Sequence, residues 1–414
     1  MRSTDVRILY LHQYFTTPSH YGGIRSYQFA KRLVEDGHSV DMLTSTAFFP
    51  VPRKHRLQLI SKHEVDGIKV HAIHISYGNN MSFIRRAVAF LLFMLVSSAY
   101  ILSFKKSDLV LASSTPLTIA VPALIVKWTY GIPLIFEVRD LWPDIPIAMG
   151  IIKNKWARGF LRWFEMLVYR HSRKIVALST GMQEVLIAKG VSAKKIVVVP
   201  NACDMAEFEQ ERPCPHELAV LKQEKDTKLC LYAGTFGYVN NLSYILDLAV
   251  EIKKNKTAIK FVLIGSGAER EMLLQRVCHE GLERQVVIYD PVSKEVLIDY
   301  IKSVDACVSV VQDNSVLFHN SANKFFDALA AGKPVVINHG GWQADVIEKY
   351  RLGIVLNRDV QESVSRLTDF LFGGGGRTTE EISTFARENY SREVLYKKFY
   401  SFAIRPFTEK DNGC

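Results

Sequence analysis

Short runs of aliphatic and β-branched residues alternate with longer helical stretches along this chain. In the first half, strands are expected at residues 6–11, 39–44, 68–75, 109–112, 134–138, 174–178 and 196–199. In the second half, they are expected at residues 228–233, 260–264, 286–289, 306–310, 335–337 and 353–356. This alternation is typical of parallel sheets that are covered by helices on both faces.

The strand pattern stops once, at Pro200-Asn201 and the acidic stretch that follows as far as Glu217. A chain of 414 residues exceeds the size at which one hydrophobic core usually stops growing. We therefore expect an α/β protein with two Rossmann-like, doubly wound domains facing a cleft, at residues 1–205 and 206–388. The remaining segment, 389–414, has helical periodicity and is expected to pack back on the first domain.

Charge separates the two halves. Residues 1–200 hold 26 Lys and Arg against 12 Asp and Glu, a balance of +14, and residues 201–414 hold 26 against 30, a balance of −4. The first half therefore favours an anionic partner. Nucleic acid is not expected, because no helix-turn-helix, zinc-finger or aromatic RNA-binding signature is present. The six cysteines show no metal spacing and suit a reducing cytosol.

Two segments of the first half bear on membrane contact. Residues 87–102 form a run of 16 uncharged residues, shorter than the roughly 20 that span a bilayer. A buried helix is favoured for this run over a segment that dips into the membrane surface. Residues 156–173 are basic and aromatic, and suit either a packed helix or an interfacial one. Together the two segments favour an anionic membrane surface. The N-terminus is expected to begin with a strand rather than a signal peptide.

The most informative stretch is SANKFFDALAAGKPVV, residues 321–336. It predicts a helix that begins near Asn323 and Lys324 and ends before Gly-Lys-Pro. A helix N-terminus favours a phosphate, because its free N–H groups and dipole are positive there, and Lys324 adds a charge. Asp327, one turn later, can accept hydrogen bonds from vicinal sugar hydroxyls. The stretch predicts a site for a nucleotide diphosphate.

Glycine loops follow several expected strands. Gly22 and Gly23 follow the first strand, and LYAGTFGY and FVLIGSG bring further glycines to the ends of two strands in the second half. Glycine allows a close backbone approach to a ligand, although a tight turn alone also requires it. None of these loops has the G-x-G-x-x-G spacing of dinucleotide-binding proteins. The nucleotide-binding residues proposed at these loops are Gly22, Gly23, Gly234, Thr235, Gly265 and Gly267.

The segment FEVRDLWP, residues 136–143, places Glu137, Arg139 and Asp140 at a strand end. For any one of these residues a structural ion pair is the simpler interpretation. As a group they suggest a substrate site. No D-x-D triplet and no metal-ligand spacing occurs in the chain, so no metal is expected.

In this order, these motifs resemble those of the family 4 glycosyltransferases, which are retaining enzymes of the GT-B fold. The resemblance covers nearly the whole chain and is most specific at SANKFFDALAAGKPVV. Within the family, the chain is similar to bacterial transferases of O-antigen and capsule synthesis, including N-acetylfucosaminyl transferases. The resemblance implies a nucleotide-sugar donor, a saccharide acceptor that is often polyprenyl-diphosphate-linked, no cofactor, and a place on the cytoplasmic face of the cell membrane.

The resemblance also implies roles for individual residues. Arg139, Asp140 and His319 are the expected catalytic residues. His319 and Asp327 stand where the family usually has two glutamates eight residues apart, and Thr235 with Asn240 or Asn241 replaces its usual Arg and Lys. Two rivals share the fold: a nucleotide-sugar 2-epimerase, and a degenerate transferase that serves as an assembly partner. The substitutions favour the second rival.

Overall fold

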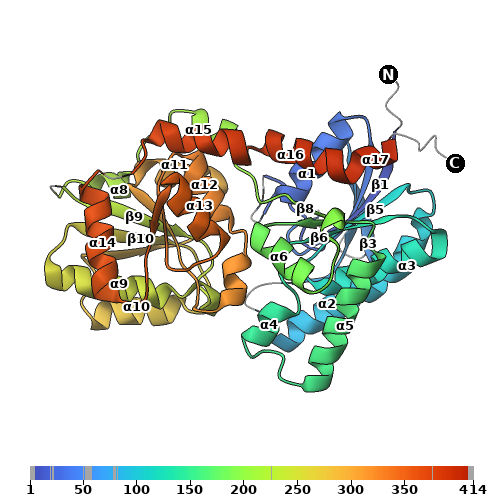
Figure 1. The fold of residues 1–414 in the computed structure, drawn as a ribbon, viewed down its shortest axis with the longest axis horizontal. Coiled ribbons are helices and arrows are strands. Elements are labelled where there is room, and N and C mark those ends of the chain that lie inside the picture. The colour runs from blue at the N-terminus through green and yellow to red at the C-terminus, as the bar shows by residue number, and fades with distance from the viewer. Residues whose placement is uncertain are drawn as a thin grey trace. The chain divides into compact units, whose positions relative to one another are not determined.

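The computed structural model describes residues 5–18, 20, 23–49, 51, 58–77, 81, 83–224, 226–374 and 376–408. The chain divides into two compact units (Figure 1). One unit contains residues Met1–Pro200 together with Tyr396–Cys414, and the other contains Asn201–Leu395. The division lies at Pro200-Asn201, five residues before the expected boundary at residue 205.

The first unit is built on an eight-stranded sheet with the order β3-β4-β2-β1-β5-β6-β7-β8. All neighbouring strands of this sheet are parallel except β3 and β4. β5 and β6 are buried at every residue, as expected for central strands covered on both faces. The strands are β1 (Arg7–Leu11), β2 (Ser39–Ser45), β3 (Ile60–Val65), β4 (Ile68–Ile73), β5 (Leu109–Ser113), β6 (Leu134–Val138), β7 (Lys174–Ala177) and β8 (Ile196–Val198).

The antiparallel edge strand β3 is absent from the strands expected from the sequence. It forms a hairpin with β4 through Asp66 and Gly67, whose φ angles are 49° and 77°. Two positive φ angles are typical of the type I′ turn, for which Asp-Gly is a strong sequence signal. The Asp-Gly turn signal is present in the sequence, but β3 was not predicted because four of its six residues are polar or charged.

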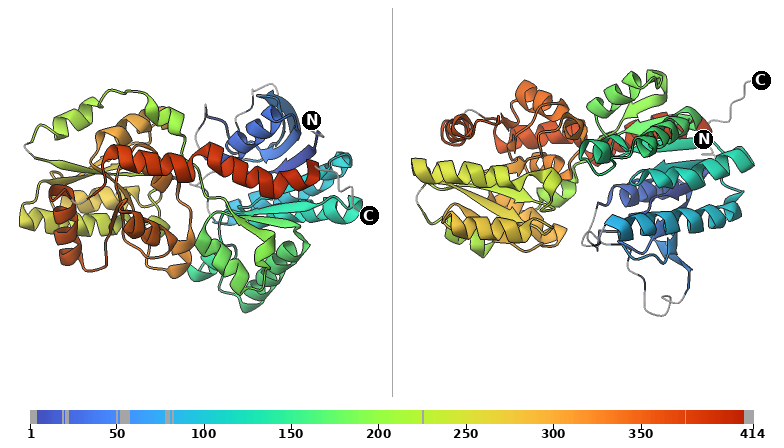
Figure 2. Two further views of the ribbon diagram at one scale, coloured as in Figure 1. Left: turned by 45° about the horizontal axis from the view of Figure 1, so that its top comes forward. Right: turned by 90° about the horizontal axis from the view of Figure 1, so that it is seen from below.

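Helices cover both sides of this sheet (Figure 2). They are α1 (Arg25–Glu35), α2 (Phe83–Tyr100), which continues into the turn η2 (Ile101–Phe104), α3 (Ala120–Tyr130), α4 (Asp144–Ala148), α5 (Lys155–His171) and α6 (Thr180–Ala188).

A buried helix was expected at residues 87–102, and this is wrong for most of the helix surface. In α2 only a stripe at every fourth residue, from Ala89 to Ile101, is fully buried, whereas Leu91 and Leu95 are 50% and 61% exposed. Among the described residues, Arg85–Phe104 is the one helical segment long and apolar enough to cross a membrane, by length and composition alone. Only 22% of its most apolar window is buried. The helix α2 carries apolar residues on all sides, but the first unit covers only one of these sides.

A buried ion pair connects the centre of the first unit. Arg25 Nε, on α1, donates to Glu137 Oε1 on β6 at 2.8 Å, and the two side chains are 5% and 1% exposed. Arg25 also donates to the carbonyl oxygens of Val199 and Pro200, just after β8. Ser113 Oγ, on β5, donates to Glu137 Oε2 at 2.6 Å. The pair therefore holds α1 against the carboxyl ends of β5, β6 and β8.

The end of the chain packs on α1. α16 (Arg392–Phe399) is followed by the π-helical turn η7 (Tyr400–Ile404) and by α17 (Arg405–Thr408). The ring of Phe399 is fully buried, and its centroid lies 4.9 Å from that of Phe29. Tyr400 and His38 share a hydrogen bond of 3.0 Å. This last segment therefore completes the core of the first unit.

The second unit has a six-stranded sheet with the order β11-β10-β9-β12-β13-β14, parallel throughout. Its strands are β9 (Lys228–Ala233), β10 (Ile259–Ile264), β11 (Val286–Tyr289), β12 (Ala306–Ser309), β13 (Val335–Ile337) and β14 (Gly353–Val355). Its helices are α7 (Met205–Glu209), α8 (His216–Leu221), α9 (Leu242–Asn255), α10 (Arg270–His279), α11 (Lys294–Ser303), α12 (Asn323–Ala330), α13 (Trp342–Tyr350), α14 (Val360–Phe372) and α15 (Thr379–Tyr390). The fold is thus the expected one of two parallel-sheet α/β domains.

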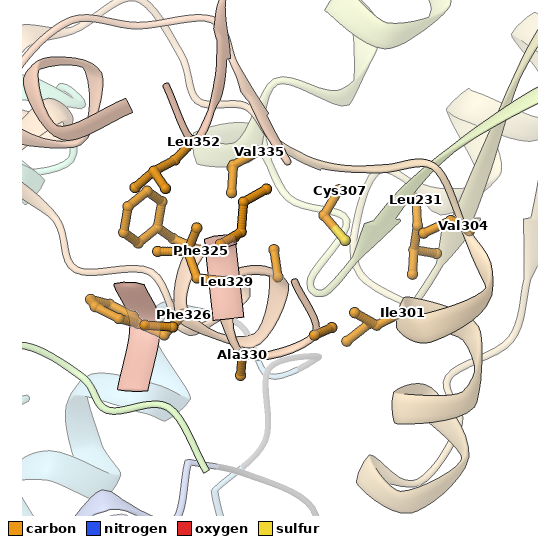
Figure 3. Close-up of a cluster of buried hydrophobic side chains, with 14 of the residues drawn as sticks. Leu231, Ile301, Val304, Cys307, Phe325, Phe326, Leu329, Ala330, Val335 and Leu352 are labelled. Carbon is orange, nitrogen blue, oxygen red and sulfur yellow. The ribbon is translucent and has the colours of Figure 1, made fainter. Parts of the chain in front are cut away.

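Two phenylalanines anchor α12 in the core of the second unit. Phe325 and Phe326 are fully buried, and their ring centroids lie 5.5 and 6.2 Å from that of Trp342. Figure 3 shows both rings and Leu329 among the cluster that covers β9, β12 and β13. On the other side of the helix, Lys324 and Asp327 are partly exposed and Asn323 is exposed. Their direction is fixed by this packing.

Two glycines hold the strand-end loops of β9 and β10 in contact. A Cβ atom added to Gly265 would lie 1.9 Å from the carbonyl oxygen of Gly234. One added to Gly267 would lie 2.2 Å from the carbonyl oxygen of Phe236. Side chains cannot approach backbone atoms so closely, so glycine is required at both positions.

We predict that Gly265→Ala destabilises the protein by about 2 kcal/mol or more, because the added methyl group displaces the neighbouring backbone. Gly237→Ala is the matched control: it lies in the same pair of loops, and its added Cβ would meet nothing closer than 3.7 Å. Urea denaturation of both variants measures the difference. Equal midpoints would contradict the tight contact between the loops.

Candidate functional site

A cavity of about 340 Å³ opens in the second unit at the carboxyl ends of β9 and β12, beside the start of α12. It brings together residues that are distant in the sequence, from the loop after β9 and from α12. Five residues proposed from the sequence line it: Gly234, Thr235, Asn323, Lys324 and Asp327. Asn240 also lines it, and its Nδ2 donates to the Thr235 carbonyl at 2.9 Å.

Lys324 is the cation of this cavity. Its Nζ lies 4.0 Å from the centroid of the Tyr232 ring, and among the described residues no carboxylate lies within ion-pair distance of it. Burial lowers the pKa of Lys324 to about 7. A bound anion would favour the charged ammonium form and raise this pKa. We therefore expect the Lys324 amine to become protonated when an anionic ligand binds beside it.

Asp327 is already paired with a cation. Lys294 Nζ, at the first residue of α11, lies 2.5 Å from Asp327 Oδ1. Burial lowers the pKa of Lys294, but the carboxylates of Asp327, Glu207 and Asp204 outweigh this and raise it. Lys294 has no local signal in the sequence beyond the ordinary helix cap Ser293, and it was therefore not predicted.

The start of α12 is fixed by Asn201. Asn201 Nδ2 donates to the Ser321 carbonyl at 2.7 Å, and Ser321 Oγ accepts from the Asn201 N–H at 3.2 Å. The N-cap residue Ala322 has no side chain that can satisfy the first turn. The Phe325 N–H donates to the Ala322 carbonyl at 3.2 Å, and the N–H groups of Asn323 and Lys324 are left for a ligand.

Three proposed residues of the second unit do not line this cavity. Gly265 and Gly267 lie against the backbone of residues 234–236, where they join the two loops. His319 ends the turn η6 (Ser315–His319), four residues before α12, and is partly buried. The His319 side chain is not among those that line the cavity.

A second cavity, of about 300 Å³, opens in the first unit at the carboxyl ends of β1, β5 and β6. Arg139, Asp140 and Gly23 line it, as does Thr115 after β5. Gly22 lies outside the described residues. Asp140 Oδ2 accepts from Thr115 Oγ1 at 2.5 Å, and Ser114 Oγ accepts from the Arg139 N–H at 3.0 Å.

His12 holds the guanidinium of Arg139. Arg139 Nη1 lies 2.9 Å from His12 Nε2, and His12 Nδ1 lies 2.7 Å from Ser26 Oγ. Burial, with the charge of Arg139, lowers the pKa of His12 well below its ordinary value. Because Arg139 can only donate, the neutral imidazole accepts at Nε2 and donates from Nδ1. The sequence analysis did not assign His12 a role; its position directly after β1 was the available signal.

Glu137 lies below this cavity and is structural. Burial raises the pKa of Glu137, but Arg25, Arg139 and hydrogen bonds from Ser113 and Arg25 outweigh it and lower the pKa. The segment 136–143 thus separates into a buried carboxylate and two residues that face the cavity. Among the described residues, no group of three or more His, Cys, Asp or Glu side chains is placed to hold a metal ion.

Comparison with known proteins identifies the family. Residues 22–202 match the Glycosyl transferase 4-like domain, and residues 216–388 match Glycosyl transferases group 1. Over 214 residues the chain is 23% identical to WcaI of Escherichia coli (strain K12), named as a colanic acid biosynthesis glycosyl transferase; this covers 50% of the chain and 51% of that protein. The chain spans little more than half the length of the curated relatives it matches.

Solved structures share the fold over nearly the whole chain. The sucrose-phosphate synthase of Thermosynechococcus elongatus has a TM-score of 0.72 at 16% identity, covering 97% of this chain and 99% of that one. Anabaena HepE in complex with UDP and glucose has a TM-score of 0.69 at 16% identity, covering 96% and 98%. With the two matched domains, this fold shows that the chain belongs to the family 4 glycosyltransferases of the GT-B fold.

Proposed function

We propose that this protein is a retaining, metal-independent glycosyltransferase. It moves a sugar from a nucleotide-diphosphate sugar to a saccharide acceptor linked to a polyprenyl diphosphate, in bacterial surface polysaccharide synthesis of the O-antigen or capsule type. The observation that carries the donor half of this proposal is the unpaired amine of Lys324 at the start of α12, inside a cavity at the strand ends. WcaI, whose name places it in colanic acid synthesis, supports the biological setting.

The donor diphosphate lies on the N-terminal N–H groups of α12, with Asn323 and Lys324 beside it. Lys324 supplies the charge that the family usually takes from the positions of Thr235 and Asn240 or Asn241. Asp327, oriented by Lys294, accepts hydrogen bonds from the ribose hydroxyls. Support comes from HepE, whose solved structures contain UDP, UDP-glucose, or UDP and glucose.

The acceptor lies in the cavity of the first unit, where Arg139 and Asp140 contact it. His12, which binds Arg139, is a positioning residue. In the reaction the acceptor hydroxyl forms a bond to the anomeric carbon on the face from which the nucleoside diphosphate leaves. The leaving phosphate accepts the hydroxyl proton. No enzyme nucleophile is needed, and Lys324 stabilises the charge that develops on the phosphate.

The first unit contacts an anionic membrane through α2, α3 and α5. α3 packs against both other helices. Leu95 of α2, Trp128 of α3 and Trp156 of α5 are 61%, 55% and 88% exposed. Exposed basic side chains accompany them: Lys105, Lys106, Lys153, Lys155, Arg162 and Arg170. Aromatic and basic residues on one face are typical of interfacial helices, and such a surface would place the enzyme at the cytoplasmic face of the membrane.

Lys324→Ala is expected to weaken binding of the nucleotide-sugar donor tenfold to a hundredfold, because a charge-assisted hydrogen bond is worth roughly 1.5–3 kcal/mol. Isothermal titration calorimetry measures this. Lys333→Ala, which removes a lysine just beyond the same helix and outside the cavity, is the control and should bind as wild type does. Donor affinity unchanged in Lys324→Ala, in a folded protein, would show that the phosphate lies elsewhere.

The same titrations at several pH values give a second readout. In the free protein Lys324 has a pKa of about 7, so it loses its charge above that pH. Since the diphosphate favours the charged form, donor affinity should be constant below about pH 7 and fall by up to about tenfold per pH unit above it. Lys324→Ala should lack this slope.

Sugar transfer is expected to continue at close to its normal rate in excess EDTA, because Lys324 and backbone N–H groups neutralise the leaving phosphate. The assay follows nucleoside diphosphate release with and without the chelator. Activity that EDTA abolishes and Mg²⁺ or Mn²⁺ restores would refute the proposed diphosphate site.

Binding to vesicles that contain phosphatidylglycerol is expected, and it should weaken with added salt, since exposed charges are screened over about 8 Å at physiological ionic strength. The double variant Leu91→Gln/Leu95→Gln should bind less, and Val220→Gln, an exposed apolar position of the second unit, should not change binding. Co-sedimentation measures the bound fraction. Equal recovery of wild type with neutral and anionic vesicles would contradict the membrane surface.

A further inference from the structure

Four aromatic rings from four separate segments meet beside the cavity of the first unit. They are Tyr14 after β1, Phe48 after β2, Tyr77 after β4, and Phe90 on α2. The centroid of Tyr77 lies 5.1 Å from that of Tyr14, 6.3 Å from that of Phe48 and 5.5 Å from that of Phe90. Tyr14, Phe48 and Tyr77 line the cavity, and Phe90 packs against Tyr14 and Tyr77 without lining it. We call these four residues the aromatic wall.

The lining rings of the aromatic wall do not belong to the buried core. Tyr14, Phe48 and Tyr77 are each partly exposed. Their sequence neighbours Phe15 and Phe49, by contrast, are 0% and 6% exposed. In each of the sequence pairs Tyr14-Phe15 and Phe48-Phe49, the second ring lies in the core and the first ring lines the cavity. Burial in the core stabilises the fold and explains why Phe15 and Phe49 are aromatic. The partly exposed rings are better explained by contact with a ligand.

The aromatic wall is also rigid. Tyr77 is stacked on Phe90 with 26° between the ring planes, and Tyr14 packs edge-on to Phe48 at 87°. Each lining ring therefore contacts at least two others of the wall. A surface held in this way loses little conformational entropy when a ligand binds to it.

The other lining groups of the same cavity are polar and of mixed hydrogen-bonding type. Asp140 accepts, Arg139 donates, and the hydroxyls of Ser114 and Thr115 can do both. Asp140 Oδ1 has no hydrogen-bond partner among the described residues, whereas Oδ2 is held by Thr115. The cavity thus combines an apolar lining with a set of donors and acceptors.

We propose that the aromatic wall binds the C–H face of a pyranose ring of the acceptor, while Asp140 and Arg139 bind its hydroxyls. A pyranose has both surfaces, an apolar C–H face and a rim of hydroxyls that donate and accept. A hydrocarbon chain would desolvate Asp140 and Arg139 and offer no partner to their remaining polar atoms, such as Asp140 Oδ1, which is costly. This inference rests on the proposed function, because it assigns the acceptor sugar to that same cavity. It makes Tyr77 a residue that determines acceptor affinity.

Saturation-transfer-difference NMR on the full chain tests this, with the methyl glycosides of glucose, galactose, mannose, fucose and N-acetylglucosamine as probes. Wild type should transfer saturation to the ring C–H protons of at least one glycoside. Tyr77→Leu should weaken that binding at least tenfold, and Tyr77→Phe, which keeps the ring, should bind within about twofold of wild type. Phe372→Leu, an exposed ring of the second unit, is the control and should bind as wild type does.

Binding of the glycoside to Tyr77→Leu as tightly as to wild type would overturn the proposal. So would the absence of saturation transfer to every probe in wild type, or displacement of the glycoside by uridine. If Tyr77→Leu does not fold, Phe48→Leu replaces it, with the same expectation. Glycoside binding in a wild-type protein that transfers no sugar would refute the transferase alone. Transfer with an unchanged acceptor KM in Tyr77→Leu would refute the aromatic wall alone.

Discussion

The buried pair of Arg25 and Glu137 is the interaction on which the first unit depends. Arg25 reaches from α1 to β6 and to the carbonyls after β8, and Glu137 accepts from Ser113 on β5. Each buried charge is acceptable only because the other is present. The strand ends joined in this way carry the residues of the cavity, which begin one or two positions later at Ser114 and Arg139. The ion pair therefore supports the side of the cavity that Ser114, Thr115, Arg139 and Asp140 form.

In the second unit, aromatic packing orients the helix that carries the proposed phosphate site. Phe325 and Phe326 anchor α12 in the core, so that its first turn and Lys324 face the cavity. Among the described residues no carboxylate pairs with the Lys324 amine, and burial lowers its pKa to about 7 although the face of Tyr232 lies 4.0 Å away. A bound anion would stabilise the charged form of this amine. In the proposed function, Lys324 thereby replaces the Arg and Lys that the family usually has at the positions of Thr235 and Asn240 or Asn241.

Much of the fold follows from local pattern. β5 and β6 are buried on both faces and begin with the apolar runs at residues 109–112 and 134–136. The helix of SANKFFDALAAGKPVV has signals for both its start and its end in the sequence. The errors came from relations between distant segments. Nothing in the composition of α2 indicates that one side lacks a covering element. Likewise, Gly265 fits a ligand loop and a loop contact equally well until Gly234 is seen against it.

The charged residues of the candidate site could be predicted from the sequence, but the residues that orient them could not. Lys324, Arg139 and Asp140 stand out in the sequence because of their place after strands or at a helix start. His12 and Lys294, which orient Arg139 and Asp327, are set by contacts more than 30 residues away along the chain and have no comparable local signal. The aromatic wall was missed for the same reason, since its rings come from four segments.

Product analysis tests the central claim most directly. The protein is incubated with a nucleotide-diphosphate sugar and a lipid-linked saccharide, and the products are examined by mass spectrometry and by NMR of the new anomeric centre. The account predicts a glycosylated lipid acceptor, one nucleoside diphosphate released for each sugar transferred, and the same anomeric configuration as in the donor. An isomerised nucleotide sugar with no glycosylated acceptor, or a product of inverted configuration, would contradict it.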